Sequence, residues 1–267
     1  MKSKQGFLRI FAANYLDFKH LAMHRNIFIL IFSLFLSLPI TAQIGEPRSD
    51  WAIGVNGGVT LNKVLFTPNI RQQMYTAPTF GITARYTSEK YFSLLCAIHM
   101  ELNYTRLGWK EDIYGADNAK LDDTYTRQID YLQLPILASL GLGKEKDGLR
   151  GYLLAGPQLG YALTDKEVRS SIWTTRIVEE VEVPNRANNV YAQYGKALDK
   201  RFDYGIMLGL GSELSTKVGH FLFDVRYYYG LSDIFNNAKK DPFSRSAHNT
   251  ISCKLSYLID FKKRSQR

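Results

Sequence analysis

The segment from Phe221 to Leu231, with the sequence FLFDVRYYYGL, decides the fold class. Successive side chains of an extended strand point to opposite faces, so the segment divides into two sets of residues. One face is wholly apolar or aromatic and consists of Phe221, Phe223, Val225, Tyr227 and Tyr229. The other face is mixed and carries the charges of Asp224 and Arg226. An unpaired charge is costly to bury, so the segment predicts either a strand of a soluble sandwich or a membrane-barrel strand with its apolar face toward lipid.

Other segments of the chain also read as extended strands, several of them with a clear alternation. They are Trp51–Asn62, Pro78–Thr87, Tyr91–Thr105, Tyr125–Gly143, Leu149–Leu163, Arg201–Leu214 and Thr250–Phe261. After residue 42 no stretch has a sustained helical period, and no further apolar run is long enough for a membrane helix. Pro135 and Pro157 fall inside two of these segments and predict bulges or strand ends, because proline lacks the N–H that a strand ladder needs.

The connections between these segments alternate between long and short. Long connections are expected at 61–78, 106–126, 164–200 and 232–249, and short ones at 87–90, 143–148 and 215–219. This rhythm is typical of a barrel with long outer loops and short periplasmic turns, whereas a soluble sandwich has no reason to keep it. We therefore expect an all-β fold, an antiparallel up-and-down transmembrane β-barrel of about eight strands, over residues 43–267.

The N-terminal region has the features of a secretory signal peptide. Residues 24–43 read HRNIFILIFSLFLSLPITAQ, with a basic start, an apolar run and a small residue before the expected cleavage after Ala42. We assign 23–42 as the signal peptide and expect residues 1–22 to be an over-called start or a dispensable extension, because Met23 directly precedes the signal. Export together with a barrel predicts the outer membrane of a Gram-negative bacterium.

Charge and cysteine usage exclude several classes of function. The formal net charge of +9 falls to +5 without residues 1–42, with 29 Lys and Arg against 24 Asp and Glu. That balance is too mild to indicate binding of nucleic acid. Cys96 and Cys253 form no metal-ligand pattern, and we expect both to be unpaired residues on lipid-facing surfaces.

Several runs of the chain resemble the PorT-like outer-membrane β-barrel family of Bacteroidetes-type bacteria. The runs are GVNGGVTLN (54–62), ELNYTRLGWK (101–110), YLQLPIL (131–137), GYLLAGPQLGY (151–161), FDYGIMLGLG (202–211) and RYYYGLSDIF (226–235). The resemblance implies an outer-membrane location and no cofactor. The named member of the family takes part in protein secretion, but the resemblance does not imply that this chain does. Residues 164–200 match no motif of the family.

The inward faces of the expected strands carry a set of titratable residues. They are Arg85, His99, Glu101, Asp203, Glu213, Asp224, Arg226 and Lys254. An eight-stranded barrel is just wide enough to be filled by side chains, so opposite charges there can pair and seal it. The alternative is a narrow or gated pore lined by the same residues. Glu101 and Arg226 are the pair that we expect across the lumen.

No catalytic or metal-binding constellation is evident. Ser215 is close to His220 in sequence, but no third group that would orient the pair is apparent. The sequence has no GxSxG, HExxH, phosphate-binding loop or zinc pattern. We expect a non-enzymatic scaffold or accessory protein, with lipid around it and with outer loops that contact a secretion or envelope protein. The alternatives are a narrow solute channel and a lipid-processing enzyme. Within residues 164–200 we expect the two flanking strands to continue above the membrane as a hairpin that offers a partner surface. The alternative is a segment that only shields the mouth of the barrel.

Overall fold

The computed structural model describes residues 46–91, 94–143 and 148–261. The expected signal peptide and residues 1–22 lie outside the described residues. Secondary structure in the described part consists of strands, whose bounds are β1 Glu46–Thr67, β2 Gln72–Gln73, β3 Tyr75–Tyr91, β4 Leu94–Glu111, β5 Tyr125–Gly143, β6 Gly148–Arg169, β7 Thr175–Val178, β8 Val181–Pro184, β9 Phe202–Thr216, β10 Gly219–Gly230 and β11 Arg245–Asp260. Within these ranges no helix has the length and apolar character needed to cross a membrane.

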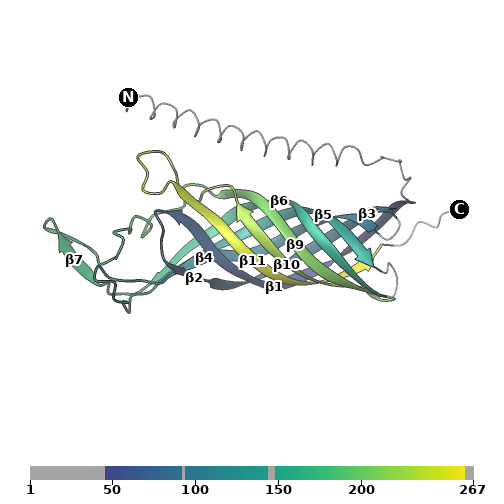
Figure 1. The fold of residues 1–267 in the computed structure, drawn as a ribbon, viewed down its shortest axis with the longest axis horizontal. Helices are drawn as coiled ribbons and strands as arrows, with labels where there is room; N and C mark the ends of the chain where they lie inside the picture. Colours follow the sequence, from purple (N-terminus) through teal and green to yellow (C-terminus); the bar gives the residue numbers. More distant parts are fainter. Residues whose placement is uncertain (1–45, 92–93, 144–147, 262–267) are drawn as a thin grey trace, which may run out of the picture. The chain divides into compact units, whose positions relative to one another are not determined.

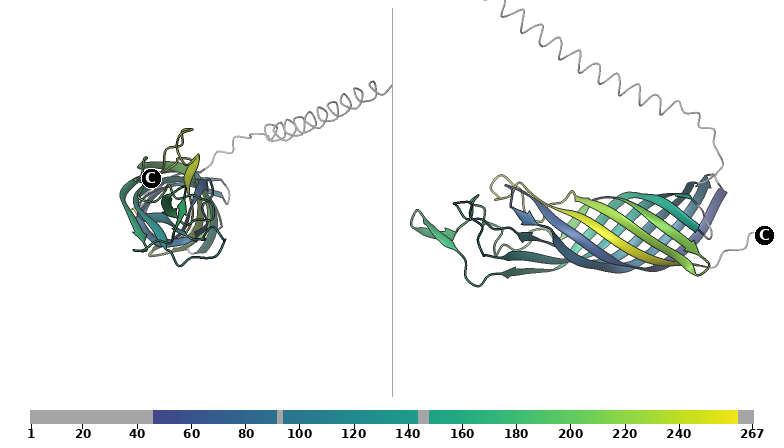
Figure 2. Two further views of the ribbon diagram at one scale, coloured as in Figure 1. Left: turned by 90° about the vertical axis from the view of Figure 1, so that its left-hand side faces the viewer. Right: turned by 60° about the horizontal axis from the view of Figure 1, so that its bottom comes forward.

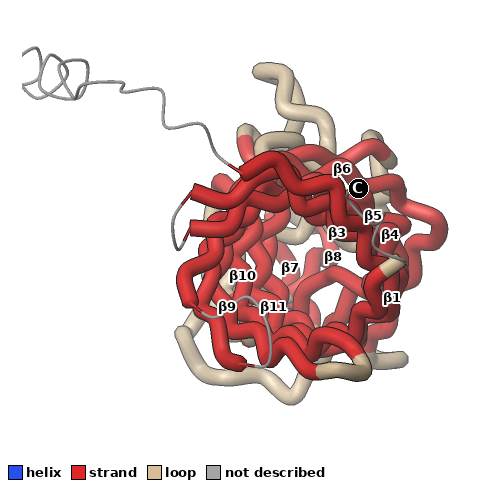
Figure 3. The backbone as a smooth tube through the Cα atoms, turned by 90° about the vertical axis from the view of Figure 1, so that its right-hand side faces the viewer, coloured by secondary structure: helices blue, strands red, loops and turns tan. Residues whose placement is uncertain are grey.

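The long strands form one closed antiparallel ring (Figures 1 and 3). The strand order is β4-β3-β1-β11-β10-β9-β6-β5, and an additional β4–β5 pairing closes the circle. The first and last strands pair with each other from Ala52–Asp260 to Thr67–Arg245. Apart from this seam, every neighbour in the ring is also a neighbour among the long strands along the chain. The expected up-and-down barrel of about eight strands is therefore confirmed.

The barrel extends beyond the expected strands at both ends, and more strands extend at one of them. This end, which we call the loop end, carries the connections after β1, β4, β6 and β10, and the opposite turn end is where β1 begins and β11 ends (Figure 1). β5 has the expected bounds, but β1 continues to Thr67, β6 continues to Arg169 and β11 begins at Arg245. The four loops are correspondingly shorter than expected. The additional strand residues include many polar side chains. The alternation of apolar and polar residues that marks a lipid-facing strand is therefore missing there, and the sequence does not reveal these strand ends.

The expected turn at 87–90 is wrong. β3 continues through these residues to Tyr91, which pairs with Leu94 of β4. The pairing register shifts between Thr87 and Glu89, which marks a β-bulge. Polar residues of the sequence TSEK look like a turn, but here they belong to a strand end beyond the apolar band.

The bulges or strand ends expected at the two prolines are also wrong. The β4–β5 pairing passes from Met100–Ile136 to Asn103–Gln133 without a change of register, and Pro135 pairs with Gln158 on its other side. Pro157 likewise pairs with Ile206 of β9 in an unbroken register. A proline removes one donor, toward one neighbouring strand, so each interruption is local and the barrel continues past it.

The two faces of the barrel differ as the alternation requires. On β10, Phe221 and Phe223 are 48% and 46% exposed, whereas Asp224 and Arg226 are 1% and 2% exposed. Aromatic side chains pair on the outer face near the turn end, where the ring centroids of Trp51 and Tyr86 lie 4.9 Å apart. The exposed apolar side chains form the surface that lipid would cover.

Apolar side chains also fill part of the interior. One cluster lies in the barrel and consists of Ala52, Leu137, Tyr152, Leu154, Met207, Leu222, Tyr228 and Leu258. A larger cluster lies at the loop end and contains Val64, Phe66, Ile70, Leu107, Trp109, Ile113, Tyr125, Ile129, Tyr131, Ala162, Ile234, Phe235 and Phe243. The loop end is therefore closed by a core of its own, which the expectation of a wholly polar interior did not include.

A two-stranded hairpin extends past the loop end of the barrel (Figures 1 and 2). It is formed by β7 and β8, which pair from Thr175–Pro184 to Val178–Val181. Its tight turn contains Glu179 and Glu180, whose φ angles are 48° and 65°. A hairpin was expected in the 164–200 region as a continuation of the two flanking strands. The observed hairpin is instead a separate sheet, because β6 ends at Arg169 and β9 begins only at Phe202.

The lipid-facing surface can be tested with a charge on its central band. Leu210 is 63% exposed and lies on β9 between aromatic side chains near the two ends, such as Tyr204 and Phe221. We expect Leu210→Arg to lower the free energy of unfolding in lipid vesicles by about 2–4 kcal/mol, since lipid cannot solvate the guanidinium. Ile177→Arg on the hairpin should change it by less than about 0.5 kcal/mol. Equal effects of the two substitutions in urea unfolding would contradict a membrane location of β9.

Candidate functional site

A compact ion-pair cluster lies in the middle of the lumen, and we call it the central cluster. Arg226 of β10 donates from Nε to Asp224 Oδ1 at 2.5 Å and from Nη2 to Glu101 Oε1 at 2.7 Å. Lys254 of β11 donates to Glu101 Oε2 at 2.6 Å, and Asn103 of β4 donates to the same oxygen at 2.9 Å. Two cations and two carboxylates balance one another, and all four are at least 97% buried. Glu101 and Arg226 are thus in contact across the lumen.

A second cluster lies nearer the turn end, and Glu213 of β9 is its centre. Arg85 Nη1 lies 2.8 Å from Glu213 Oε1, and Arg150 Nη2 lies 2.6 Å from Glu213 Oε2. The imidazole of His220 contacts Glu213 as well, with Nδ1 2.7 Å from Oε1. Arg150 was absent from the residues expected in the lumen, because alternation along Leu149–Leu163 is weak. Its position two residues before the buried Tyr152 is the signal that would have found it.

The turn-end cluster contains a row of residues that resembles a catalytic triad. Ser215 Oγ lies 3.1 Å from His220 Nδ1, and His220 Nε2 lies 3.0 Å from Asp260 Oδ2. The expectation that no third group accompanies Ser215 and His220 is therefore wrong. However, Glu213 Oε1 lies 2.7 Å from the same Nδ1 and also accepts a hydrogen bond from Ser215 Oγ at 3.3 Å. In a catalytic triad that nitrogen faces the serine alone, so this row differs from a triad at Glu213.

The remaining two residues of the expected lumenal set lie apart from these clusters. His99 is buried with its ring centroid 6.1 Å from that of Tyr152. Asp203 of β9 accepts hydrogen bonds from Tyr228 Oη at 2.7 Å and from Ser232 Oγ at 2.5 Å. All eight expected residues are buried inside the barrel, and six of them belong to the two ion-pair clusters.

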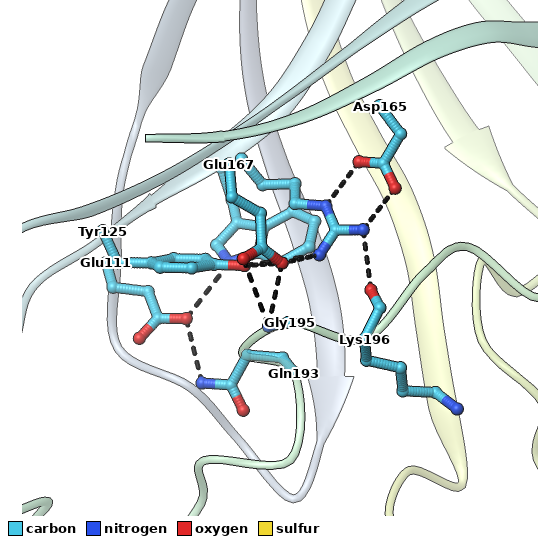
Figure 4. Close-up of polar contacts among 9 residues, drawn as sticks. Glu111, Tyr125, Asp165, Glu167, Gln193, Gly195 and Lys196 are labelled. Atoms are coloured by element: carbon cyan, nitrogen blue, oxygen red, sulfur yellow. Dashed lines mark hydrogen bonds and ion pairs between the residues drawn. The ribbon is translucent and has the colours of Figure 1, made fainter. Parts of the chain in front are cut away.

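The loop end is closed by the connection between β6 and β9, residues 170–201. Arg127 of β5 is 2% exposed and forms ion pairs with Asp165 and Glu167 of β6. The same guanidinium donates to the backbone carbonyl of Lys196 at 2.7 Å, and Gly195 N donates to Glu167 at 3.1 Å (Figure 4). A buried arginine thus holds this connection over the mouth of the barrel.

Glu111, at the end of the neighbouring strand β4, fixes the same connection as well. Its carboxylate accepts hydrogen bonds from Gln193 Nε2 at 3.0 Å and from Tyr194 Oη at 2.5 Å (Figure 4 shows the Gln193 contact). Burial beside Glu111 raises the pKa of Tyr194 well above its usual value, so the phenol remains a donor. Arg186 stacks on Trp173 and Tyr194, with its guanidinium carbon 4.5 and 5.2 Å from their ring centroids. We call residues 170–201 the mouth loop.

Sequence reasoning missed the charged residues that attach the mouth loop. Arg127 alternates with Tyr125, Ile129 and Tyr131, all fully buried, and this alternation was the available signal for an inward position. Glu111 and Arg186 fall where loops were expected, and no periodic pattern marks a buried charge in a loop.

Little space remains between the side chains of the lumen. A cavity of about 20 Å³ lies beside Arg226 and Lys254, which is room for about one water molecule. Ion pairs at two levels, an apolar core at the loop end and the mouth loop together close the interior.

An apolar outer surface, a closed antiparallel ring and a polar filled lumen define the class of outer-membrane β-barrels. Residues 41–236 match the family described as outer membrane protein beta-barrel domain. The chain therefore belongs to this family, and its location is the outer membrane of a Gram-negative bacterium. The narrower PorT-like assignment is not part of this match.

Solved structures of other outer-membrane proteins are similar to this chain. OprG from Pseudomonas aeruginosa has 12% identity and a TM-score of 0.43, covering 82% of this chain and 99% of its own. Neisserial surface protein A has 13% identity and a TM-score of 0.35, covering 78% and 96%. Ail of Yersinia pestis has 10% identity and a TM-score of 0.34, covering 79% and 100%. These likenesses are too distant to assign an activity. No curated protein matches the chain.

The central cluster can be tested by removing one charge. Glu101→Gln leaves Lys254 without a carboxylate partner, and we expect a loss of about 3–5 kcal/mol in the free energy of unfolding, measured by urea titration in lipid vesicles. Lys254→Met in the same chain should restore part of that loss, because it removes the unpaired ammonium.

The matched control is Glu180→Gln at the exposed tip of the hairpin, which should change stability by less than about 0.5 kcal/mol. If the double variant is less stable than Glu101→Gln alone, the loss does not arise from an uncompensated charge.

Proposed function

We propose that this protein is a sealed, non-enzymatic barrel that anchors its outer loops in the membrane and offers them to a partner protein. The observation that carries the proposal is the closed lumen: Arg226, Glu213 and Arg127 each hold an ion-pair cluster at a different level. A transported solute would have to break these clusters in succession, and each leaves buried charges unpaired when opened. The interior therefore supports anchoring and not conduction.

The β7–β8 hairpin is the surface that we propose for the partner. Ile177, Val178 and Val181 are 78%, 42% and 60% exposed on a hairpin that extends past the loop end of the barrel. Exposed apolar side chains on a projecting element are typical of protein–protein contacts. The resemblance to a secretion-associated family makes components of secretion or envelope upkeep the first candidates for this partner.

An enzymatic role has less support. The only serine and histidine that meet in the described lumen are Ser215 and His220, and both ring nitrogens of His220 face carboxylates. A lipid-processing reaction would need a free base at this point. The arrangement instead ties the ends of β9, β10 and β11 together.

Conductance in planar bilayers tests the closed lumen. We expect purified protein to give no steady openings, because the central cluster and the mouth loop block the path independently. Replacing the mouth loop by a short linker should leave the protein non-conducting, because the clusters around Arg226 and Glu213 still fill the lumen. Large, steady openings of the unaltered protein would establish a channel and contradict the proposal.

Photo-crosslinking in cells tests the hairpin. A photoreactive residue in place of Ile177 should capture a defined protein, since this side chain is 78% exposed on the hairpin. The control position is Lys239, which is exposed in the loop between β10 and β11 and should give no such product. Identical products from both positions, or none from Ile177, would count against a partner at the hairpin. Recovery of secretion components would support the accessory role.

A further inference from the structure

A separate cavity lies among the outer loops, and it has the features of a ligand site. Its volume is about 240 Å³, and its lining comes from three connections: the one after β1, the one after β4 and the mouth loop. No residue of the β7–β8 hairpin lines it. At roughly 30 Å³ for each water, the cavity holds about eight waters, which exceeds the needs of a bare inorganic anion and suits one hexose unit.

The three loops are fixed to one another around this cavity. Asp112 N donates to Arg71 O at 3.0 Å, and Ala187 N donates to Tyr114 O at 2.9 Å. Asn188 Nδ2 donates to the carbonyl of Asn69 at 2.7 Å. The cavity is thus framed by backbone contacts between loops that are far apart in sequence. A preformed site of this kind loses little conformational entropy when a ligand binds.

Two arginines are among the residues that line the cavity, and they differ in their accessibility. Arg71 is exposed and lies over the ring of Tyr114, with 4.7 Å between its guanidinium carbon and the ring centroid. Among the described residues it forms no ion pair. Arg186 is 4% exposed, and its Nη2 has no hydrogen-bond partner although Nη1 and Nε are engaged. That nitrogen has no accessible surface and the guanidinium already pairs with Asp123 at 3.0 Å, so a ligand in the cavity meets Arg71 and not Arg186.

The acidic residues of the lining are already engaged. Glu111 accepts hydrogen bonds from Gln193 and Tyr194, and Asp112 pairs with Lys120 at 2.9 Å. Arg186 pairs with Asp123 at 3.0 Å, so the available charge in the cavity is that of Arg71. The rest of the lining supplies amides for hydroxyl groups and an apolar floor, with Asn118 and Asn188 among the amides and Ile70 and Ile113 in the floor.

We propose that this cavity binds one sugar unit bearing a carboxylate or a phosphate group. Arg71 holds the anionic group, because a guanidinium forms paired hydrogen bonds with such oxygens. The amide of Asn118 binds a hydroxyl group, and the apolar floor contacts the ring. The site lies outside the membrane-spanning part, so its ligand is a glycan or glycolipid headgroup at the cell surface.

Binding can be measured by calorimetry with the full chain in nanodiscs, using glucuronate and glucose 6-phosphate as probes and glucose as the neutral comparison. We expect saturable binding of at least one acidic sugar and about tenfold weaker binding of glucose. Arg71→Gln should lower the affinity for the acidic sugar about tenfold. Asn118→Gly removes an amide while keeping the backbone, whose φ is 60°, and should lower the affinity about threefold.

The matched control is Arg201→Gln, which removes an exposed arginine near the loop end that does not line the cavity. It should bind the acidic sugar like the unaltered protein, and the folded form of each variant is checked by its heat-dependent migration in gel electrophoresis. Absence of saturable binding, equal binding of glucose, or equal affinities of the Arg71→Gln and Arg201→Gln variants would overturn the proposal.

The proposal of a partner at the hairpin and the proposal of a sugar site can be tested separately. Ile177→Ser combined with Val181→Ser should abolish capture of a partner at the hairpin and leave sugar binding unchanged. Loss of sugar binding in that variant would contradict a cavity independent of the hairpin.

Discussion

Every strand amide that meets lipid needs a partner in a neighbouring strand, and this requirement governs the rest of the structure. It forces the ring to close through β4–β5 and through β1–β11, which leaves no open edge among the long strands. A closed ring in turn isolates its interior from bulk water. Each charge that alternation places inside must therefore find a partner there, which accounts for the balance around Arg226 and Glu213.

The fold class could be predicted from the sequence because two of its patterns can be seen over short stretches. Apolar and polar residues alternate along each strand, and long and short connections alternate between strands. Phe221 and Phe223 must meet lipid while Asp224 must avoid it, and a few residues suffice to show this. Strand ends were less predictable, since β1 and β6 continue above the membrane where both faces can be polar. The prolines illustrate another limit: Pro135 costs one hydrogen bond toward one neighbour, and the sequence does not show that the register survives this loss.

The candidate sites were predictable in part for the same reason. Alternation placed Glu101, Arg226 and Lys254 inside, but their contacts depend on strand tilt and stagger, which a linear pattern does not contain. Arg127 alternates with apolar residues that face inward, so its inward position could have been predicted, but it was not. Arg186 could not have been found, because its surroundings come from loops that approach only after the barrel has formed. The cavity beside Arg71 belongs to the same category, since three separate connections build it.

The seam between β1 and β11 has a consequence for the order of assembly. Its pairs run from Ala52–Asp260 to Thr67–Arg245, so the two ends of the barrel domain meet along their whole length. The ring cannot be completed while the last strand is still being synthesised or translocated. Until then the chain carries two unpaired strand edges, which are prone to associate with other chains. Maturation of this barrel is therefore a post-export event that depends on the final sixteen-residue strand, β11.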